Sequence, residues 1–463
     1  MAAQHSTTYD NLLPKNINGD SVAELRKLDF QGNERLHLIP TIDDEVRAAL
    51  TLLQEPETLD DEDAFMRRER LAELILKYPA HRATFESSIS YENDTEKSPK
   101  NEEEEEEEEE FYTPASGELV SARKFLIGYS LDRAKQRLRK ESLKAQTFNL
   151  PEELKKRRQT GSYVKNIELI GSQVVSRRPV CQVALSPNED YVAAASWAGD
   201  ITLLDKQSLK ILDAQHGAFT GKVGGMDWGI GHDMLVAGGE DGLVKVFAMH
   251  NNQLRNTNTY EGHENRVAAT KFHPSGNYIA SASFDMTWRL WDVESRNELL
   301  LQEGHSQEIY SLAFQCDGAL LCTAGLDSMG LVWDLRSGKR TTVLSGHAQP
   351  IYSVDWSPNG YQVVTGSGDG TLKIWDLRKS EHQETILAHN SIVTRVKFDK
   401  SGCCLISCGY DKAINLYSTD NWLKLTTLQG HMDKILCSDI AEGASSVVSS
   451  GWDRSVKLWR VEN

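Results

Sequence analysis

The chain has 463 residues, of which 39% are hydrophobic, so it is long enough for more than one domain and for a sizeable core. A formal net charge of -17 argues against a protein that coats nucleic acid non-specifically. We expect no secretory signal, and no stretch reaches the roughly 18 consecutive apolar residues of a membrane-spanning helix. The seven cysteines include no CxxC pair, which predicts reduced and mostly buried thiols.

Residues 1–78 carry three short helical patterns. A capping box at residues 21–24 opens the first helix, and Asp43 or Asp44 caps a second helix with apolar residues on one face. A third helix begins near Asp63. Its early turn holds Arg67, Arg68 and Arg70, for which a solvated face and a contact with a partner both stay open.

Residues 79–116 are predicted to be a disordered acidic spacer. They are polar, lack periodicity and contain nine consecutive glutamates, Glu102–Glu110, which repel one another. A flexible spacer is the favoured interpretation. The alternative is that this run shields the basic segment that follows it from wrong RNAs.

Residues 117–160 are predicted to form basic amphipathic helices. One long helix is expected over Ser116–Lys144, with an interrupted apolar stripe of Leu119, Ala122, Leu126, Tyr129 and Leu138. We expect the stripe to enter a groove of a partner protein and the basic flank to contact RNA phosphates; an ordinary solvated helix is the alternative. The cations of this flank are Arg123, Lys124, Arg133, Lys135, Arg137, Arg139 and Lys140.

A second, shorter helix is predicted from Pro151 and ends in a run of four cations. Lys155, Lys156, Arg157 and Arg158 suit either a nuclear localisation signal or a phosphate-binding patch. Residues 145–165 are expected to tether the basic segment to the following domain, which would make binding bivalent.

Residues 161–463 contain a repeat with a period of 42 residues. His263, His305, His347, His389 and His431 are each followed, at offsets of 18, 22 and 28 residues, by Ser or Thr, by Asp and by Trp or Tyr. The pattern resembles the WD40 family, in which each repeat forms one four-stranded blade. Two weaker copies precede these five, one with His216, Asp241 and Phe247, and an earlier one over Ser196–Asp205. The expected fold is therefore all-β, a seven-bladed WD40 β-propeller, preceded by a mostly helical and partly disordered N-terminal arm.

The last predicted strand, Ser455–Arg460, lies so near the end of the sequence that its blade lacks an outer strand. Residues 166–170 precede the first blade and resemble an outer strand. We expect this segment to pair with the last blade and close the ring, because a closed ring leaves no free sheet edge.

The co-occurrence of His, Ser or Thr and Asp raises the possibility of a hydrolase with a catalytic triad. The same offsets recur in every regular repeat, whereas an active site is needed once, so we expect no catalytic residue. No phosphate-binding loop, HExxH motif or zinc-ligand spacing occurs, so no cofactor, metal or small-molecule substrate is expected. Resemblance to WD40 proteins implies instead a buried structural tetrad in each blade: His263, Ser281, Asp285 and Trp291; His305, Thr323, Asp327 and Trp333; and His347, Thr365, Asp369 and Trp375.

Several segments resemble one particular group of WD40 proteins. Leu53–Leu59 with Arg67–Leu71, Phe111–Ala115 with Ser121–Leu131, and Ser283–Trp291 in the repeats are similar to the WD-repeat protein family of the U4/U6 small nuclear ribonucleoprotein. This resemblance implies a nuclear pre-mRNA splicing factor that scaffolds the U4/U6 and U4/U6·U5 particles. The implied partners are U4 and U6 snRNA, a second U4/U6-specific protein and other tri-snRNP proteins, with no membrane. A generic WD40 adaptor, such as a ubiquitin-ligase substrate receptor, is the alternative.

Overall fold

A computed structural model describes residues 43–53, 55–56, 66–67, 70–71, 74, 115–229, 231, 234–379 and 382–462. The chain divides into two compact units, Met1–Pro114 and Ala115–Asn463, each of which is considered by itself. The predicted capping box at residues 21–24, the acidic run at 102–110 and Arg68 lie outside the described residues.

The described part of the first unit has a small apolar core. Helix α2 (Asp43–Leu52) has its apolar residues at the helical spacing noted in the sequence, and this spacing places them on one face. That face packs against the described residues of the predicted third helix. The cluster consists of Val46, Ala49, Leu50, Leu53, Leu71 and Leu74.

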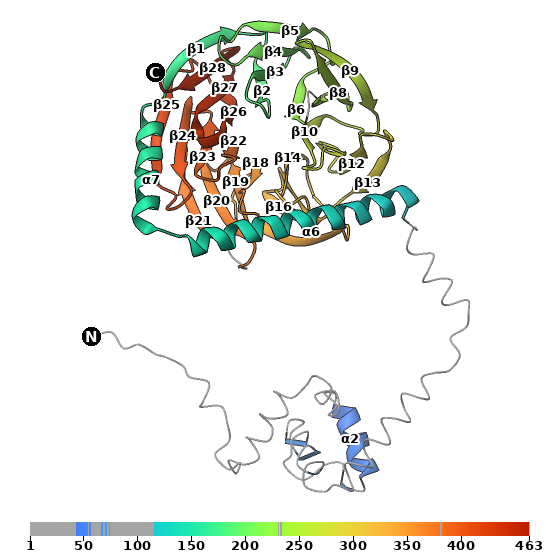
Figure 1. Cartoon of the computed structure of the whole chain (residues 1–463). Coiled ribbons are helices and arrows are strands. Elements are labelled where there is room, and N and C mark those ends of the chain that lie inside the picture. The colour runs from blue at the N-terminus through green and yellow to red at the C-terminus, as the bar shows by residue number, and fades with distance from the viewer. Residues whose placement is uncertain are drawn as a thin grey trace. The chain divides into compact units, whose positions relative to one another are not determined.

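The second unit is a ring of seven four-stranded antiparallel sheets (Figure 1). This arrangement confirms the predicted seven-bladed β-propeller. Within each blade, apolar residues from both faces of the sheet are buried, because each blade is covered by a neighbour on either side. A blade alone would leave both apolar faces in water, so the ring is the smallest unit that buries its own core.

Six blades follow the chain in order. Blade 1 comprises β2 (Val180–Leu185), β3 (Tyr191–Ser196), β4 (Ile201–Asp205) and β5 (Ile211–Gln215). Blade 2 comprises β6 (Val223–Trp228), β7 (Met234–Gly239), β8 (Val244–His250) and β9 (Gln253–Tyr260). Blade 3 comprises β10 (Val267–Phe272), β11 (Tyr278–Ser283), β12 (Trp288–Asp292) and β13 (Glu298–Gln302).

The next three blades repeat this plan. Blade 4 comprises β14 (Ile309–Phe314), β15 (Leu320–Gly325), β16 (Met329–Asp334) and β17 (Lys339–Ser345). Blade 5 comprises β18 (Ile351–Trp356), β19 (Gln362–Ser367), β20 (Thr371–Asp376) and β21 (His382–Leu387). Blade 6 comprises β22 (Val393–Phe398), β23 (Cys404–Gly409), β24 (Ala413–Ser418) and β25 (Lys424–Gln429).

Blade 7 closes the ring with strands from both ends of the unit. It contains β26 (Ile435–Ile440), a 3-10 turn (Glu442–Ala444), β27 (Ser446–Gly451) and β28 (Ser455–Arg460). Its outer strand is β1 (Glu168–Val174), which pairs antiparallel with β28. The predicted latch is confirmed, and the strand spans Glu168–Val174 instead of the predicted 166–170.

Each blade has a β-bulge in its first strand. The pairing register skips one residue in six of these strands and two in β6, so the skipped residues leave the ladder and turn toward the central channel. In β14 and β18 these residues are Tyr310 and Tyr352, and both line the channel. The bulge is therefore the device by which a regular strand presents a large side chain to the axis of the ring.

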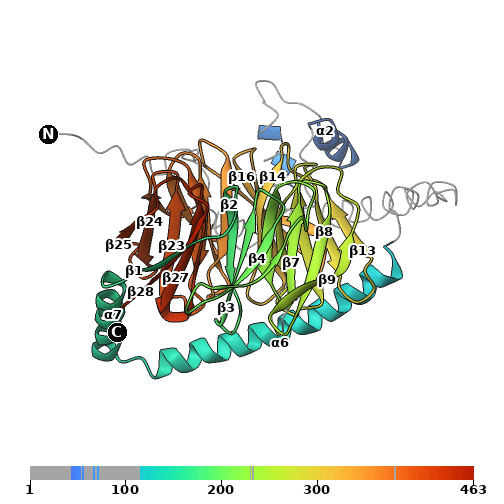
Figure 2. The same ribbon diagram turned by 90° about the horizontal axis from the view of Figure 1, so that it is seen from above.

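Two helices precede β1 and belong to the same compact unit as the blades. Helix α6 (Gly117–Gln146) crosses one face of the ring, and α7 (Leu150–Lys165) runs beside β25 (Figures 1 and 2). The predicted long helix is present with nearly the predicted bounds, whereas the second helix continues well beyond Arg158. Among the described residues no helix is long and apolar enough to cross a membrane.

Candidate RNA and partner interface

The first half of α6 is held against the ring by its apolar stripe. The side chain of Ser116 caps the helix by accepting a hydrogen bond from the backbone N–H of Leu119 at 3.2 Å. Leu119, Ala122 and Leu126 are buried in a cluster with residues of blades 3 and 4. Burial of the two leucines contributes about 3–6 kcal/mol. The expectation that this stripe enters a partner's groove is therefore wrong, because the chain's own blades cover it.

Tyr129 continues this contact at the middle of the helix. Its hydroxyl donates to the carbonyl oxygen of Pro274 at 2.5 Å, and its ring lies 5.6 Å from that of His273. His273 is fully buried beneath the helix, and burial lowers the pKa of its imidazole to about 4. The imidazole is thus neutral at physiological pH and serves as an uncharged packing surface for α6.

Arg137 anchors the second half of α6. Its guanidinium forms a bidentate pair with the Asp317 carboxylate, in which Nη2 lies 2.7 Å from Oδ2 and Nε lies 3.0 Å away. Nη1 also donates to the Asn359 carbonyl at 2.8 Å. The hydrogen bond with Asp317, which outweighs the effect of burial, raises the pKa of Arg137 above its ordinary value. The sequence assigns Arg137 to the RNA-facing flank, but the structure uses its donors to hold the helix to blades 4 and 5.

The remaining cations of α6 differ in exposure. Arg123 is half-buried, with its guanidinium against the turn at Gly338 in blade 4, so it also faces the ring. Arg133 is exposed, and its Nη1 donates to the Tyr129 hydroxyl at 3.0 Å. The other predicted contact residues of this helix are exposed to solvent: Lys124, Lys135, Arg139 and Lys140.

Helix α7 is packed against blades 6 and 7. Val164 near its end is fully buried, and the Tyr163 hydroxyl donates to the Ser445 carbonyl at 3.2 Å. The Arg157 guanidinium pairs with Asp420 at 2.9 Å. Residues 145–165 connect α6 to the ring mainly through α7, and Val164 is buried against blades 6 and 7. Its exposed cations are Lys155, Lys156, Arg157 and Arg158.

The outward face of α6 carries a second set of apolar side chains, which the sequence reading missed. Val120, Ile127, Leu131 and Leu138 are between 39% and 56% exposed. Leu138 is expected in the buried stripe, but it belongs to this outer set. The spacing of seven, four and seven residues is that of one face of a coiled-coil helix, and this spacing is the signal that could have found the set.

The splicing-motif arginines lie in the first unit. Arg67 is only 5% exposed, and Arg70 donates through Nη2 to the Pro56 carbonyl at 3.0 Å. The first of these is therefore not part of a solvated face, and Arg70 makes at least one contact with its own unit.

The predicted tetrads form hydrogen-bonded chains within single blades. In blade 4, His305 Nδ1 lies 2.8 Å from the Asp327 carboxylate, and Nε2 lies 2.8 Å from the Thr323 hydroxyl. Trp333 Nε1 donates to the same hydroxyl at 2.9 Å. A carboxylate can only accept, so Nδ1 carries the ring proton and the hydroxyl donates to Nε2. The same connections occur in blade 3 (His263, Ser281, Asp285, Trp291), in blade 5 (His347, Thr365, Asp369, Trp375) and in blade 7 (His431, Ser449, Asp453, Trp459).

Blade 2 replaces the polar tetrad by an apolar pair. His216 stands 25 residues before Asp241, three too many, and its side chain is 79% exposed. Phe219 occupies the histidine position, is buried and packs edge-on against Phe247 at 6.5 Å. The sequence analysis places His216 in this weaker copy of the repeat, but His216 does not occupy the histidine position of the blade. The blade tolerates the change because both polar partners are replaced together, so no buried donor is left unsatisfied.

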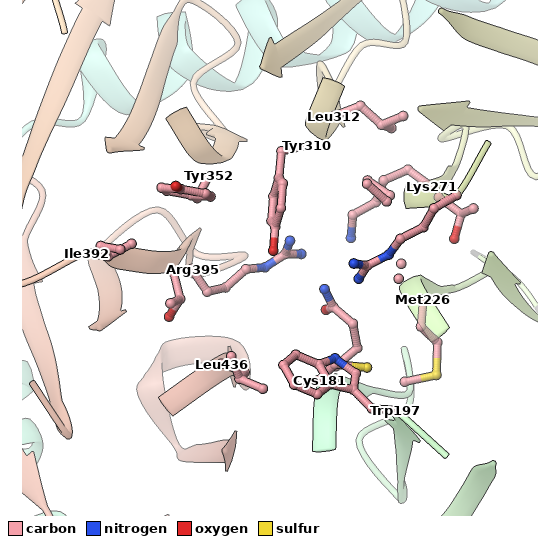
Figure 3. A pocket seen from close by; sticks show the side chains of 18 of the residues that line it. Cys181, Trp197, Met226, Lys271, Tyr310, Leu312, Tyr352, Ile392, Arg395 and Leu436 are labelled. Atoms are coloured by element: carbon pink, nitrogen blue, oxygen red, sulfur yellow. The ribbon is translucent and has the colours of Figure 1, made fainter. Parts of the chain in front are cut away.

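The central channel holds a cavity of about 120 Å³ lined by aromatic and cationic residues (Figure 3). Tyr310, Tyr352 and Trp197 surround it, and the Arg395 and Lys271 side chains reach into it. Lys271 is paired with Asp227 at 2.7 Å, so part of this charge is neutralised inside the protein. The volume suits a few water molecules, and the lining contains no nucleophile paired with a general base.

The seven cysteines are free thiols. Burial raises the pKa of Cys181, Cys404 and Cys408 to about 12, so these thiols are unreactive at neutral pH. No group of three or more His, Cys, Asp or Glu side chains that could hold a metal ion occurs within the part of the chain that the structure describes.

Comparisons with known proteins agree with this fold. Residues 223–463 match the family described as the IFT122 first beta-propeller. The chain is 47% identical over 270 residues to the U4/U6 small nuclear ribonucleoprotein PRP4 of Saccharomyces cerevisiae, which covers 58% of this chain and 57% of that protein. An uncharacterised WD repeat-containing protein of Schizosaccharomyces pombe is 38% identical over 53% of this chain and 52% of its own length. Human U4/U6 small nuclear ribonucleoprotein Prp4 is 35% identical over 35% of this chain and 29% of its own length.

The chain thus spans little more than half the length of the two fungal relatives. The resemblance to the WD-repeat protein of the U4/U6 particle, indicated by motifs in the arm and in the repeats, is confirmed by these identities. Since the match over residues 223–463 covers more than half of the sequence, the chain belongs to the IFT122 first beta-propeller family, and it is similar to the Prp4 proteins of yeast and mammals.

Proposed function

We propose that this protein is a nuclear pre-mRNA splicing factor, a non-catalytic scaffold subunit of the U4/U6 snRNP and the U4/U6·U5 tri-snRNP. The observation that carries the proposal is the surface formed by α6 and α7. Two helices rich in lysine and arginine are docked on a rigid ring, and the chain is 47% identical to a yeast protein named for the U4/U6 particle.

Contact with U4 and U6 snRNA is assigned to the exposed cations of the two helices. Lys124, Lys135, Arg139 and Lys140 on α6, with Lys155, Lys156 and Arg158 on α7, point to solvent. Docking on the propeller holds them in one arrangement before RNA arrives, so little ordering entropy is lost on binding.

Contact with the second U4/U6-specific protein is assigned to the outer apolar set of α6. Val120, Ile127, Leu131 and Leu138 follow a heptad-like spacing that suits a partner helix, and Lys124, Lys135 and Arg139 lie beside them. The rest of the ring offers loop surfaces to other tri-snRNP proteins.

A scaffold role also accounts for the histidines and hydroxyls of the blades. In blades 3, 4, 5 and 7 the His, hydroxyl and Trp side chains of the tetrads are buried, and the histidines are hydrogen-bonded to the Asp carboxylates of the same blade. A generic WD40 adaptor remains the competing function, and association with U4 and U6 RNA separates the two.

The test is affinity purification of tagged protein from nuclear extract, followed by probing of the bound RNA. We expect enrichment of U4 and U6 RNA but not of U1. Charge reversal at Lys135, Arg139, Lys155 and Lys156 should abolish this enrichment. The matched control reverses four exposed cations outside α6 and α7, namely Arg177, Arg178, Lys210 and Arg255, and should leave the enrichment unchanged. Absence of both RNAs with the wild-type protein would leave only the adaptor function.

A further inference from the structure

A groove of about 1010 Å³ separates the second half of α6 from the turns of blades 4 to 6. Lys140 and Lys144 line it on the side of the helix, and Lys400, Tyr361 and Trp422 line it on the side of the blades. Ser130 is the last buried residue of α6. Beyond it, the helix is held to the blades mainly by the hydrogen bonds of Arg137.

Each of the three acidic side chains that line the groove is already ion-paired. Asp317 pairs with Arg137 at 2.7 Å, Glu141 pairs with the same guanidinium at 3.4 Å, and Asp420 pairs with Arg157 at 2.9 Å. Among the described residues, no carboxylate lies within ion-pair distance of the three lysines: Lys140, Lys144 and Lys400. Five cations and three carboxylates line the groove, so it keeps a net positive charge that suits an anionic ligand.

The cations of α6 that line the groove share one face of the helix. Arg133, Arg137, Lys140 and Lys144 are spaced by four, three and four residues. At about 1.5 Å of rise per residue, successive cations lie about 4.5–6 Å apart along the axis. This interval is comparable with the distance between neighbouring phosphates of an extended nucleic-acid strand, and it does not match a single compact anion.

Trp422 supplies an aromatic surface in the same groove. Its backbone is left-handed, with φ of 56°, a conformation that costs a tryptophan about 1 kcal/mol or more. The ring is half-buried and packs edge-on against Phe398 at 6.4 Å, which fixes its position. Tyr361 beside it is held by the Arg378 guanidinium, 3.6 Å from the ring centroid. Cations that follow a backbone, next to an aromatic ring that accepts a base, are the means by which proteins hold single strands.

We propose that this groove binds a single-stranded segment of RNA, with its phosphates along Lys140, Lys144 and Lys400 and a base stacked on Trp422. The inference rests on the proposed splicing function and identifies which form of RNA this surface takes. The outer face of α6 stays available for protein at the same time, because the two sets of side chains lie on different sides of the helix.

The test uses the full-length protein and a labelled oligouridylate of about ten nucleotides, with a duplex of equal length for comparison. Reversal of Lys140, Lys144 and Lys400 to Glu should weaken oligouridylate binding at least tenfold. It should also reduce the slope of log Kd against log salt by about 2, since each phosphate contact on a single strand contributes about 0.7. The matched control, Arg177→Glu with Lys210→Glu and Arg255→Glu, changes the charge equally at exposed cations outside α6 and α7 and should keep the wild-type slope.

Substitutions at Trp422 test base stacking separately from charge, because they leave the net charge of the groove unchanged. Trp422→Ala should weaken oligouridylate binding roughly tenfold with no change in salt slope or in duplex binding, and Trp422→Phe should retain the affinity. Equal losses in the groove variant and in the matched control, or Trp422→Ala without effect, overturn the proposal. So does tighter binding of a glutamate-rich peptide of equal charge, which would make the groove a protein site. These outcomes do not contradict the proposed function, because that function is tested by U4 and U6 association in nuclear extract, whereas the groove is tested by oligouridylate binding.

Discussion

Replacing Thr323 by valine tests whether the tetrads stabilise the blades. The change keeps the shape of the side chain but removes the hydroxyl that donates to His305 Nε2 and accepts from Trp333 Nε1. His305 and Trp333 are both buried, so each nitrogen is left without a partner, at a cost of about 1–3 kcal/mol. We expect a loss of about 3 kcal/mol in the free energy of unfolding.

The expected shift in melting temperature follows from the size of the folded unit. The compact unit has roughly 350 residues, for which the unfolding entropy is about 0.7 kcal/mol/K. A loss of about 3 kcal/mol therefore lowers Tm by about 4 °C in differential scanning calorimetry. Thr323→Ser keeps the hydroxyl and removes one methyl group, so it should cost about 1 kcal/mol and lower Tm by little more than 1 °C.

The same substitution in another blade separates a structural role from a catalytic one. Thr365→Val in blade 5 removes the equivalent hydroxyl, which lies 2.7 Å from His347 Nε2. A comparable drop in Tm is expected, because each blade contains its own tetrad. If Thr323→Val melts with the wild-type protein while Thr323→Ser does not, the assigned hydrogen bonds do not stabilise the fold and the reasoning is refuted.

Three further predictions follow from the packing. Deleting residues 161–172 removes most of β1, so the ring should not close and the protein should aggregate through the exposed edge of β28. Unchanged thermal unfolding of the deletion variant would refute the latch. Arg137→Ala leaves the buried Asp317 carboxylate unpaired, so limited proteolysis should cut α6 faster, whereas Lys135→Ala on the outer face should not change the rate. Burial would raise the pKa of Asp453, but hydrogen bonds from His431 and Ser455 outweigh it and lower that pKa from 3.8 to about 2. Because the pKa is lower in the folded state, this stability is complete above pH 3.8 and is lost as the pH falls toward 2, and Asp453→Asn should flatten acid unfolding in that window.

The sequence alone determines the ring. Each regular repeat is specified by residues within about 42 positions of one another, and the same pattern recurs in successive repeats. The latch follows as well, because a blade that lacks its outer strand near the end of the repeat array requires one from elsewhere. The long basic helix is also readable, since Ser116 is a local cap and the apolar spacing is local.

Only the tertiary structure decides what the arm does with these features. Arg137 finds Asp317 across 180 positions of sequence, and Leu126 packs on blades whose residues lie more than 140 positions away. The spacing of apolar residues along a helix does not show whether that face packs on the same chain or binds another protein. For the same reason the groove beside Trp422 is invisible in the sequence: its walls come from one helix and three blades, and their meeting depends on the closure of the ring.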